Sequence, residues 1–75
     1  MITYEYDKLM GERIRTLRER VCMTQEQLSA KLQILGCDIT RSALAKIEVG
    51  QRHLYSAEIK CFKMALSTTY DELFP

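Results

Sequence analysis

Hydrophobic residues recur at helical spacing along most of the chain, and no stretch alternates for long with the two-residue period of a strand. The first apolar face has four members, spaced three or four residues apart: Met10, Ile14, Leu17 and Val21. They predict a first helix over residues 8–21, preceded by an N-terminal arm over residues 1–7. The single proline is the last residue, so no proline interrupts a helix.

The second predicted helix begins at a sharply defined cap. Thr24 and Gln27 have the spacing of a capping box, in which each side chain accepts a hydrogen bond from the backbone amide of the other residue. Met23 and Leu28 have the spacing of the hydrophobic staple that accompanies such a box. Gly36 is suited to end this helix, because glycine adopts the left-handed conformation at low cost.

Three further predicted helices also begin at capping residues. Thr40 caps a third helix that ends at Gly50, Ser56 caps a fourth, and Thr69 caps a short fifth. A chain of 75 residues has room for one domain. The sequence therefore predicts an all-α fold over residues 1–75, a compact bundle of four helices plus a short C-terminal fifth.

The second and third helices together have the outline of a helix-turn-helix over about residues 24–50. Both are short and capped, and a glycine-containing turn separates them. In this motif the later helix lies in the major groove of DNA, so about residues 40–49 form the predicted recognition helix. Gln25, in the first turn of the earlier helix, is placed to bind a phosphate with its side chain and nearby backbone N–H groups.

The predicted recognition helix carries residue types that suit contacts with bases. Arg41 can bind guanine O6 and N7 in a bidentate pair, and Ser42 can pair with donors or acceptors. Ala45 is small enough to admit DNA and to touch a thymine methyl group. Lys46, one turn further on, can reach a base edge or a phosphate.

Three segments carry a resemblance to a known family: "TQEQLSAKL", "ITRSALAKIEVGQR" and "FKMALSTTYDELF". In this order and spacing, from about Leu9 to Phe74, the chain resembles the Cro and phage-repressor helix-turn-helix family, also called the xenobiotic-response-element type. The resemblance implies a lambda-repressor-like DNA-binding domain of five helices. It implies that Gln25 binds phosphate and that the third helix faces DNA through Thr40, Arg41, Ser42 and Lys46.

The same resemblance implies two further features. Gln51 and Arg52, after Gly50, match the loop that approaches the DNA backbone beyond the third helix. With Gln25 and Thr40 they complete the expected phosphate-binding set. Arg18 and Glu48 match a pair that commonly forms a buried salt bridge between the first and third helices.

The sequence departs from the family pattern at two places. Six residues, "QILGCD", separate Leu32 from Ile39, where the compact pattern has about one. They predict an added turn in the second helix and a looser connection to the third. Val49 occupies a position that is often asparagine in the family, and valine lacks the polar group that contacts phosphate.

The net charge is +1, from 11 Lys and Arg against 10 Asp and Glu, and by itself it does not indicate a nucleic-acid binder. The distribution of charge is more informative than the sum. Five basic residues and two acids fall between Lys8 and Arg20, whereas two acids and no base follow from Ser67 to the end. The sequence therefore predicts a polarised molecule.

The three cysteines, Cys22, Cys37 and Cys61, include no CxxC pair and predict reduced thiols. Cys61 is expected in the core, and the other two are expected near loops. Together with His53 they match no common zinc-ligand spacing, so neither a metal nor a cofactor is predicted.

The chain has no Gly-rich phosphate loop and no nucleophile beside a base, and its core is too small to shape an enclosed pocket. An enzyme and a small-molecule ligand are therefore not expected. The predicted function is a sequence-specific transcriptional regulator that binds double-stranded DNA. The alternative is an antitoxin-like or dimerisation module that acts mainly through protein–protein interaction.

A homodimer is expected, because one helix contacts too few base pairs for selectivity whereas two half-sites roughly 34 Å apart form a usable operator. The candidate contacts are apolar residues near the chain ends: Tyr4, Tyr6, Tyr70, Leu73 and Phe74. No apolar run approaches the roughly 18 residues of a membrane span, and the N-terminus lacks a signal-peptide layout. A cytoplasmic protein without a membrane partner is expected.

Overall fold

The computed structural model describes residues 3–75, with side chains described from residue 5 onward, and this part of the chain contains helices and no strands. The helices are α1 (Thr3–Arg20), α2 (Gln25–Ile34), α3 (Arg41–Glu48), α4 (Ser56–Ala65) and α5 (Tyr70–Leu73). Helix α1 begins five residues earlier than the apolar pattern predicts, so residues 3–7 are helical rather than an arm. Residues 1–2 of the expected arm lie outside the described residues.

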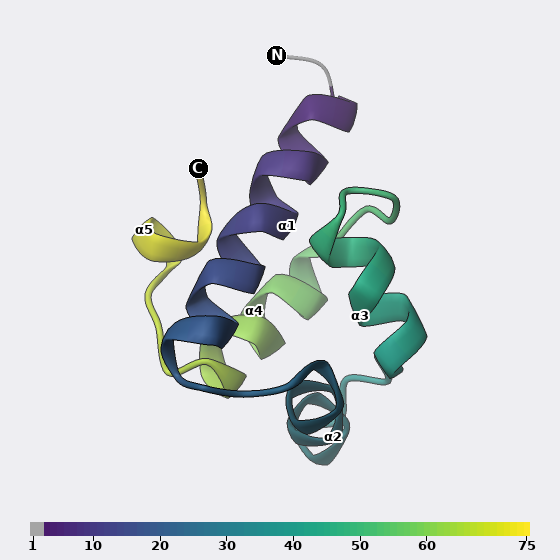
Figure 1. Cartoon of the computed structure of the whole chain (residues 1–75), viewed down its shortest axis with the longest axis vertical. Coiled ribbons are helices and arrows are strands. Elements are labelled where there is room, and N and C mark those ends of the chain that lie inside the picture. The colour runs from purple at the N-terminus through teal and green to yellow at the C-terminus, as the bar shows by residue number, and fades with distance from the viewer. Residues whose placement is uncertain (1–2) are drawn as a thin grey trace.

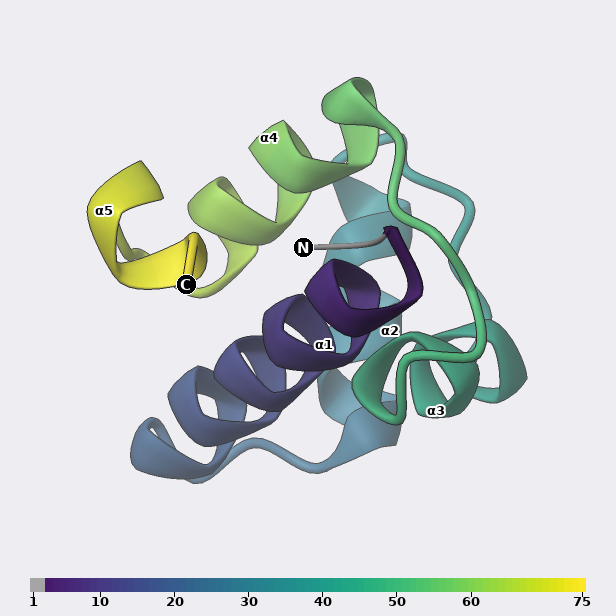
Figure 2. The same cartoon turned by 90° about the horizontal axis from the view of Figure 1, so that it is seen from above.

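Helix α1 lies in the middle of the bundle, with α3 on one side and α5 on the other (Figure 1). Seen from above, α4 lies across from α3, and α2 joins the two by packing against both (Figure 2). The core between the helices contains side chains that are fully or almost fully buried, among them Ile14, Leu28, Leu32, Leu44 and Phe62. The all-α fold and the five helices predicted from the sequence are confirmed.

Four helices end in the same hydrogen-bonded motif, in which a residue in the left-handed conformation follows the last turn. Gly36 (φ 86°) ends α2 and Gly50 (φ 79°) ends α3, as their positions in the sequence predict. Cys22 (φ 58°) and Ser67 (φ 49°) fill the equivalent positions after α1 and α4, where a side chain makes this conformation costly. In α1 the motif is closed by the Met23 amide, which donates to the carbonyl of Arg18 at 3.1 Å.

The helix starts follow their predicted caps with one exception. Thr24 and Gln27 form the complete capping box, and Thr40 accepts from the amide of Ala43 at 3.1 Å. Ser56 is the first residue of α4 and not its cap, which is Tyr55. The amide of Tyr55 donates to the Glu58 carboxylate at 3.1 Å, which is the half of a capping box that the third helical residue supplies.

The connection between α2 and α3 has the predicted extra turn, but it is not loose. The hydroxyl of Ser29 donates to the carbonyl of Ile39 at 2.7 Å, and the side chains of Cys37 and Ile39 are buried. Cys37 is thus the core cysteine, whereas Cys61 is only partly buried, contrary to the expectation from sequence. Burial, with Cys61 nearby, raises the pKa of the Cys37 thiol to about 12, so it packs as a small neutral residue.

The apolar residues near the chain ends do not all face solvent. Leu73 is fully buried in the core, so the prediction that it is an exposed contact residue is wrong. Phe74 is partly exposed and lies 6.4 Å, between ring centroids, from both Tyr6 and Tyr70. The side chain of Tyr4 lies outside the described part of the structure. None of the helices over residues 3–75 is long and apolar enough to cross a membrane.

Gly11 sets the distance between α1 and α3. A Cβ atom at this position would lie 2.1 Å from the carbonyl oxygen of Ile47 and 2.9 Å from the carbonyl carbon of Glu48. These atoms belong to backbone, which cannot move aside as the end of a flexible side chain can. Contact between the two helices therefore depends on the absence of a side chain at Gly11.

Replacement of Gly11 by alanine tests this close approach. Helix propensity alone predicts that Gly11→Ala stabilises the fold by up to about 1 kcal/mol. The collision with the α3 backbone predicts instead a loss of about 1–3 kcal/mol in the free energy of unfolding, measured in urea. Gly36→Ala is the control, because its Cβ meets open space and suffers only a strained φ. Stabilisation by Gly11→Ala would contradict the close packing.

Candidate nucleic-acid interface

Helix α3 turns one side to the core and the other to solvent (Figure 1). Leu44 and Ile47 are buried. The residues predicted to contact bases are on the outer side: Arg41, Ser42 and Lys46 are exposed, and Ala45 is partly exposed. The short, solvated face of α3 therefore brings together all the predicted base contacts.

Arg41 has one acidic neighbour, which the sequence analysis did not single out. Its Nε lies 3.8 Å from Oε1 of Glu26, in the first turn of α2. The two side chains are 64% and 78% exposed, and an ion pair so exposed contributes little to stability. Arg41 can therefore leave Glu26 for a base edge at small cost.

The ion pair expected between Arg18 and Glu48 is present at the other side of α3. Arg18 Nε donates to Glu48 Oε2 at 2.7 Å, and its Nη2 donates to Oε1 at 3.0 Å. The two side chains are only 11% and 2% exposed, so water screens the pair little. This contact raises the pKa of Arg18 above its already high ordinary value and keeps the guanidinium charged.

Two more groups complete the hydrogen bonding of this pair. Arg18 Nη1 donates to the carbonyl of Met23 at 2.8 Å, in the turn between α1 and α2. Gln25 Nε2 donates to Glu48 Oε1 at 3.1 Å. An amide nitrogen carries two N–H groups, so Gln25 keeps a second donor for a ligand. The pair thereby fixes α1, α3 and the start of α2 relative to one another.

The loop after α3 contains the two remaining predicted phosphate contacts, in different environments. Gln51 is exposed. Arg52 forms a bidentate pair with Glu58 of α4, at 3.0 and 2.9 Å, and its side chain is 30% exposed. The guanidinium of Arg52, followed by the hydrogen bond from Tyr55, lowers the pKa of Glu58 below its ordinary 4.5.

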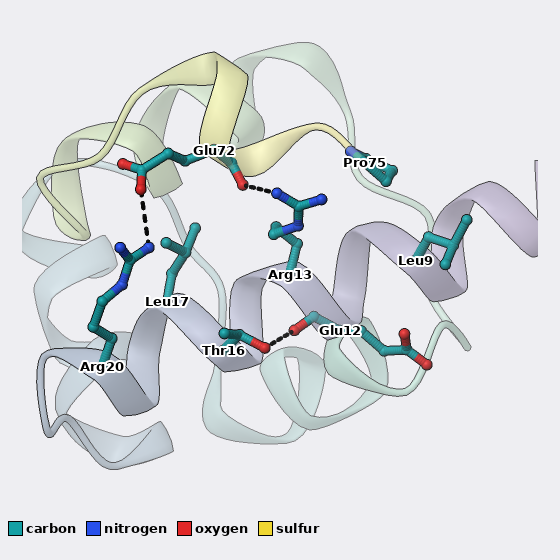
Figure 3. Close-up of a pocket in the computed structure, with 8 residues that line it drawn as sticks. All are labelled: Leu9, Glu12, Arg13, Thr16, Leu17, Arg20, Glu72 and Pro75. Carbon is teal, nitrogen blue, oxygen red and sulfur yellow. Dashed lines mark hydrogen bonds and ion pairs between the residues drawn. The ribbon is translucent and has the colours of Figure 1, made fainter.

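A cleft of about 420 Å³ lies on the far side of α1 from α3, between α1 and α5 (Figure 3). Leu9, Leu17 and Pro75 form its apolar part. Arg13 donates to the carbonyl of Glu72 at 3.1 Å, and Arg20 pairs with the carboxylate of that residue at 3.1 Å. Both arginines that line this cleft are thus engaged by Glu72 within the protein.

Comparison with known proteins gives an informative structural match. No family model matches the sequence, and no curated protein does. The restriction-modification controller protein C.AhdI from Aeromonas hydrophila has a crystal structure similar to this one, with a TM-score of 0.85 and 30% sequence identity. The match covers 99% of this chain and 100% of that chain. The chain belongs to the family of restriction-modification controller proteins.

Membership identifies this controller protein as a helix-turn-helix, sequence-specific DNA-binding transcriptional regulator and not an enzyme. The predicted function is thereby confirmed at the level of its class. The roles of individual residues at the interface remain predictions.

Three residues that shape the interface were not predicted from the sequence. Glu26 follows Gln25 in the capping segment, and only the fold brings it to Arg41. Glu58 stands three residues after the cap of α4, a spacing that does mark a capping acid. Gly11 had a detectable signal, since glycine inside a helix costs about 1 kcal/mol and is retained where a neighbour approaches closely.

Removal of one partner of the buried pair should be costly. Glu48→Ala leaves the Arg18 guanidinium without its carboxylate, so we expect the free energy of unfolding to fall by about 3–5 kcal/mol. The double variant Arg18→Met, Glu48→Leu should lose much less than the sum of the single variants, because no charge remains buried. Urea unfolding of both single variants and the double variant gives the coupling energy. Small and additive losses would be incompatible with the pair as described.

The contribution of the Arg52–Glu58 pair to stability should be detectable as a change in the free energy of unfolding when the pH is lowered. Because the pKa of Glu58 is lower in the folded state, its stabilisation is present above about pH 4.5 and disappears as the pH falls through the lowered value. Glu58→Gln should therefore be less stable than wild type at neutral pH and should lose less stability on acidification. Urea unfolding between about pH 7 and pH 3 measures both effects. Glu12→Gln, at an exposed acid, is the control and should parallel wild type.

Proposed function

We propose that this controller protein binds an operator in the control region of restriction–modification genes and regulates their transcription. The observation that supports the proposal best is the fixed, solvated face of α3, attached to α1 by the buried Arg18–Glu48 pair. A rigid helix with exposed polar side chains suits the major groove, where each base pair presents a distinct pattern of donors and acceptors. The similarity to C.AhdI supports the identity of the regulated genes.

Bases are contacted from the exposed side of α3. Arg41, at the first position of the helix, donates in a bidentate fashion to guanine O6 and N7. Ser42 pairs with a neighbouring base, and Lys46 reaches a base edge or phosphate one turn further on. Ala45 lies against a thymine methyl group, since a larger side chain there would keep the helix out of the groove.

Phosphates are contacted from the two ends of the helix-turn-helix. Gln25 donates through the N–H that Glu48 leaves free, beside the free amides of the first turn of α2. The hydroxyl of Thr40 accepts from Ala43 and keeps its own hydrogen for a phosphate oxygen. Gln51 donates from the exposed loop, and Arg52 contributes only through donors that Glu58 leaves free.

The controller protein acts as a homodimer in the cytoplasm, with a helix-turn-helix of the Cro and phage-repressor type. Two copies of α3 roughly 34 Å apart contact successive major grooves on one side of the DNA. The candidate dimer contacts are aromatic residues at the chain ends: Tyr70 and Phe74, which are exposed, and Tyr6, which is partly exposed.

The purified protein should select one double-stranded sequence from a random pool and bind it more tightly than scrambled DNA. The specific complex should weaken steeply as salt is raised, because phosphate contacts release condensed counterions. Footprinting of the selected site should show two protected half-sites related by two-fold symmetry. Equal affinity for selected and scrambled DNA would argue against a sequence-specific regulator.

Arg41→Ala should reduce affinity for the selected operator by about 1–3 kcal/mol and relax the preference at one base pair per half-site. Gln51→Ala is the matched comparison, and it should weaken operator and scrambled DNA alike, because a phosphate contact carries no sequence information. Titrations of each variant on both DNAs separate the two behaviours. An equal loss on both DNAs for Arg41→Ala would remove its assignment as a base contact.

A further inference from the structure

The loop after α3 lies directly on the first turns of α1. A Cβ atom at Gly50 would lie 2.7 Å from the Cα and 2.9 Å from the Cβ of Lys8, so the two backbones are in contact. Figures 1 and 2 both show this loop beside the N-terminal part of α1. The contact places Lys8, 42 residues away in sequence, next to the loop that approaches DNA.

The loop is fixed on both sides of this contact. His53 Nδ1 lies 2.8 Å from Oδ1 of Asp7, the neighbour of Lys8. Arg52 is paired with Glu58 of α4, and the amide of Gln51 donates to the carbonyl of Lys46 at 2.8 Å. Lys8 and the loop are therefore held in one arrangement before any DNA arrives.

Lys8 differs from the other basic residues of α1. Each arginine of this helix is hydrogen-bonded or paired within the protein: Arg13 and Arg20 to Glu72, Arg15 to Glu19, and Arg18 to Glu48. Lys8 is exposed, and among the residues whose side chains are described it takes part in no ion pair. Among the described side chains, Lys8 is thus the cation of α1 that no partner within the protein engages.

Lys8 also lies where it can supply the free positive charge that the loop lacks. Arg52, the expected cation of the loop, has both terminal nitrogens on Glu58 and is largely covered. Gln51 is exposed but neutral. A phosphate at this loop is bound more strongly where a full positive charge accompanies the neutral donor, and Lys8 is the adjacent free one.

We propose that Lys8 binds a DNA phosphate beside Gln51, and that Arg52 serves mainly to hold the loop through Glu58. Lys8 then acts as a positioning residue, which anchors the C-terminal end of α3 over the groove without distinguishing base sequences. The proposal rests on the proposed function, since it concerns how the same operator complex is held. It assigns a contact to α1, outside the helix-turn-helix.

Salt dependence tests the proposal, because each phosphate contact contributes about 0.9 to the slope of log affinity against log salt. Lys8→Ala and Lys8→Gln should each lower that slope by about one unit, on the selected operator and on scrambled DNA alike. Accordingly, the affinity ratio of wild type to variant should shrink about three- to fourfold when salt is raised fourfold. Lys8→Arg should keep the wild-type slope.

Two further variants serve as controls. Lys60→Ala removes an exposed lysine from α4 and should leave the slope unchanged. Arg52→Ala should lower the melting temperature but change the slope by much less than Lys8→Ala. A wild-type slope in folded Lys8→Ala and Lys8→Gln, or a full unit lost in Arg52→Ala, would overturn the assignment. Absence of salt-dependent, sequence-specific binding by the wild-type protein would instead overturn the proposed function itself.

Discussion

The ion pair between Arg18 and Glu48 is the interaction on which the rest of the structure depends. It joins the last turn of α1 to the last residue of α3, and through Gln25 and Met23 it also fixes the start of α2. A buried pair gains little net stability, because desolvation offsets most of the attraction. Its directional hydrogen bonds nevertheless admit only one arrangement of the three helices, and α3 is presented to DNA in that arrangement.

Backbone contacts also hold the helices of this arrangement close together. Gly11 lets α1 approach the backbone of α3, and Gly50 lets the following loop rest on Lys8. A domain of 75 residues has a small core, so packing of large side chains alone would leave α3 less firmly placed. Two glycines and one ion pair therefore supply precision that a larger protein obtains from more buried surface.

The sequence predicted features that depend on local spacing and, apart from the Arg18–Glu48 pair that the family resemblance implied, missed those that depend on tertiary contacts. Thr24, Thr40 and the two helix-ending glycines are recognisable from their neighbours, and the five helices followed from them. The early start of α1 was missed because residues 3–7, "TYEYD", have few apolar positions, and the burial of Leu73 was missed because α5 is too short to show a period. The pairs Arg41–Glu26 and Arg52–Glu58 link segments whose meeting depends on the folded chain.

A net charge of +1 is compatible with DNA binding because several of the acids are paired within the protein. Glu19, Glu48, Glu58 and Glu72 each bind an arginine. Glu26 is the acid paired with Arg41, and this exposed pair must be broken, at a small cost in free energy, before Arg41 can bind a base. In the proposed complex, a guanine offers Arg41 two acceptors in place of that carboxylate, whereas a base without them offers no such exchange. Under this proposal, an acid beside the recognition helix favours the correct site over others, although it adds nothing to overall affinity.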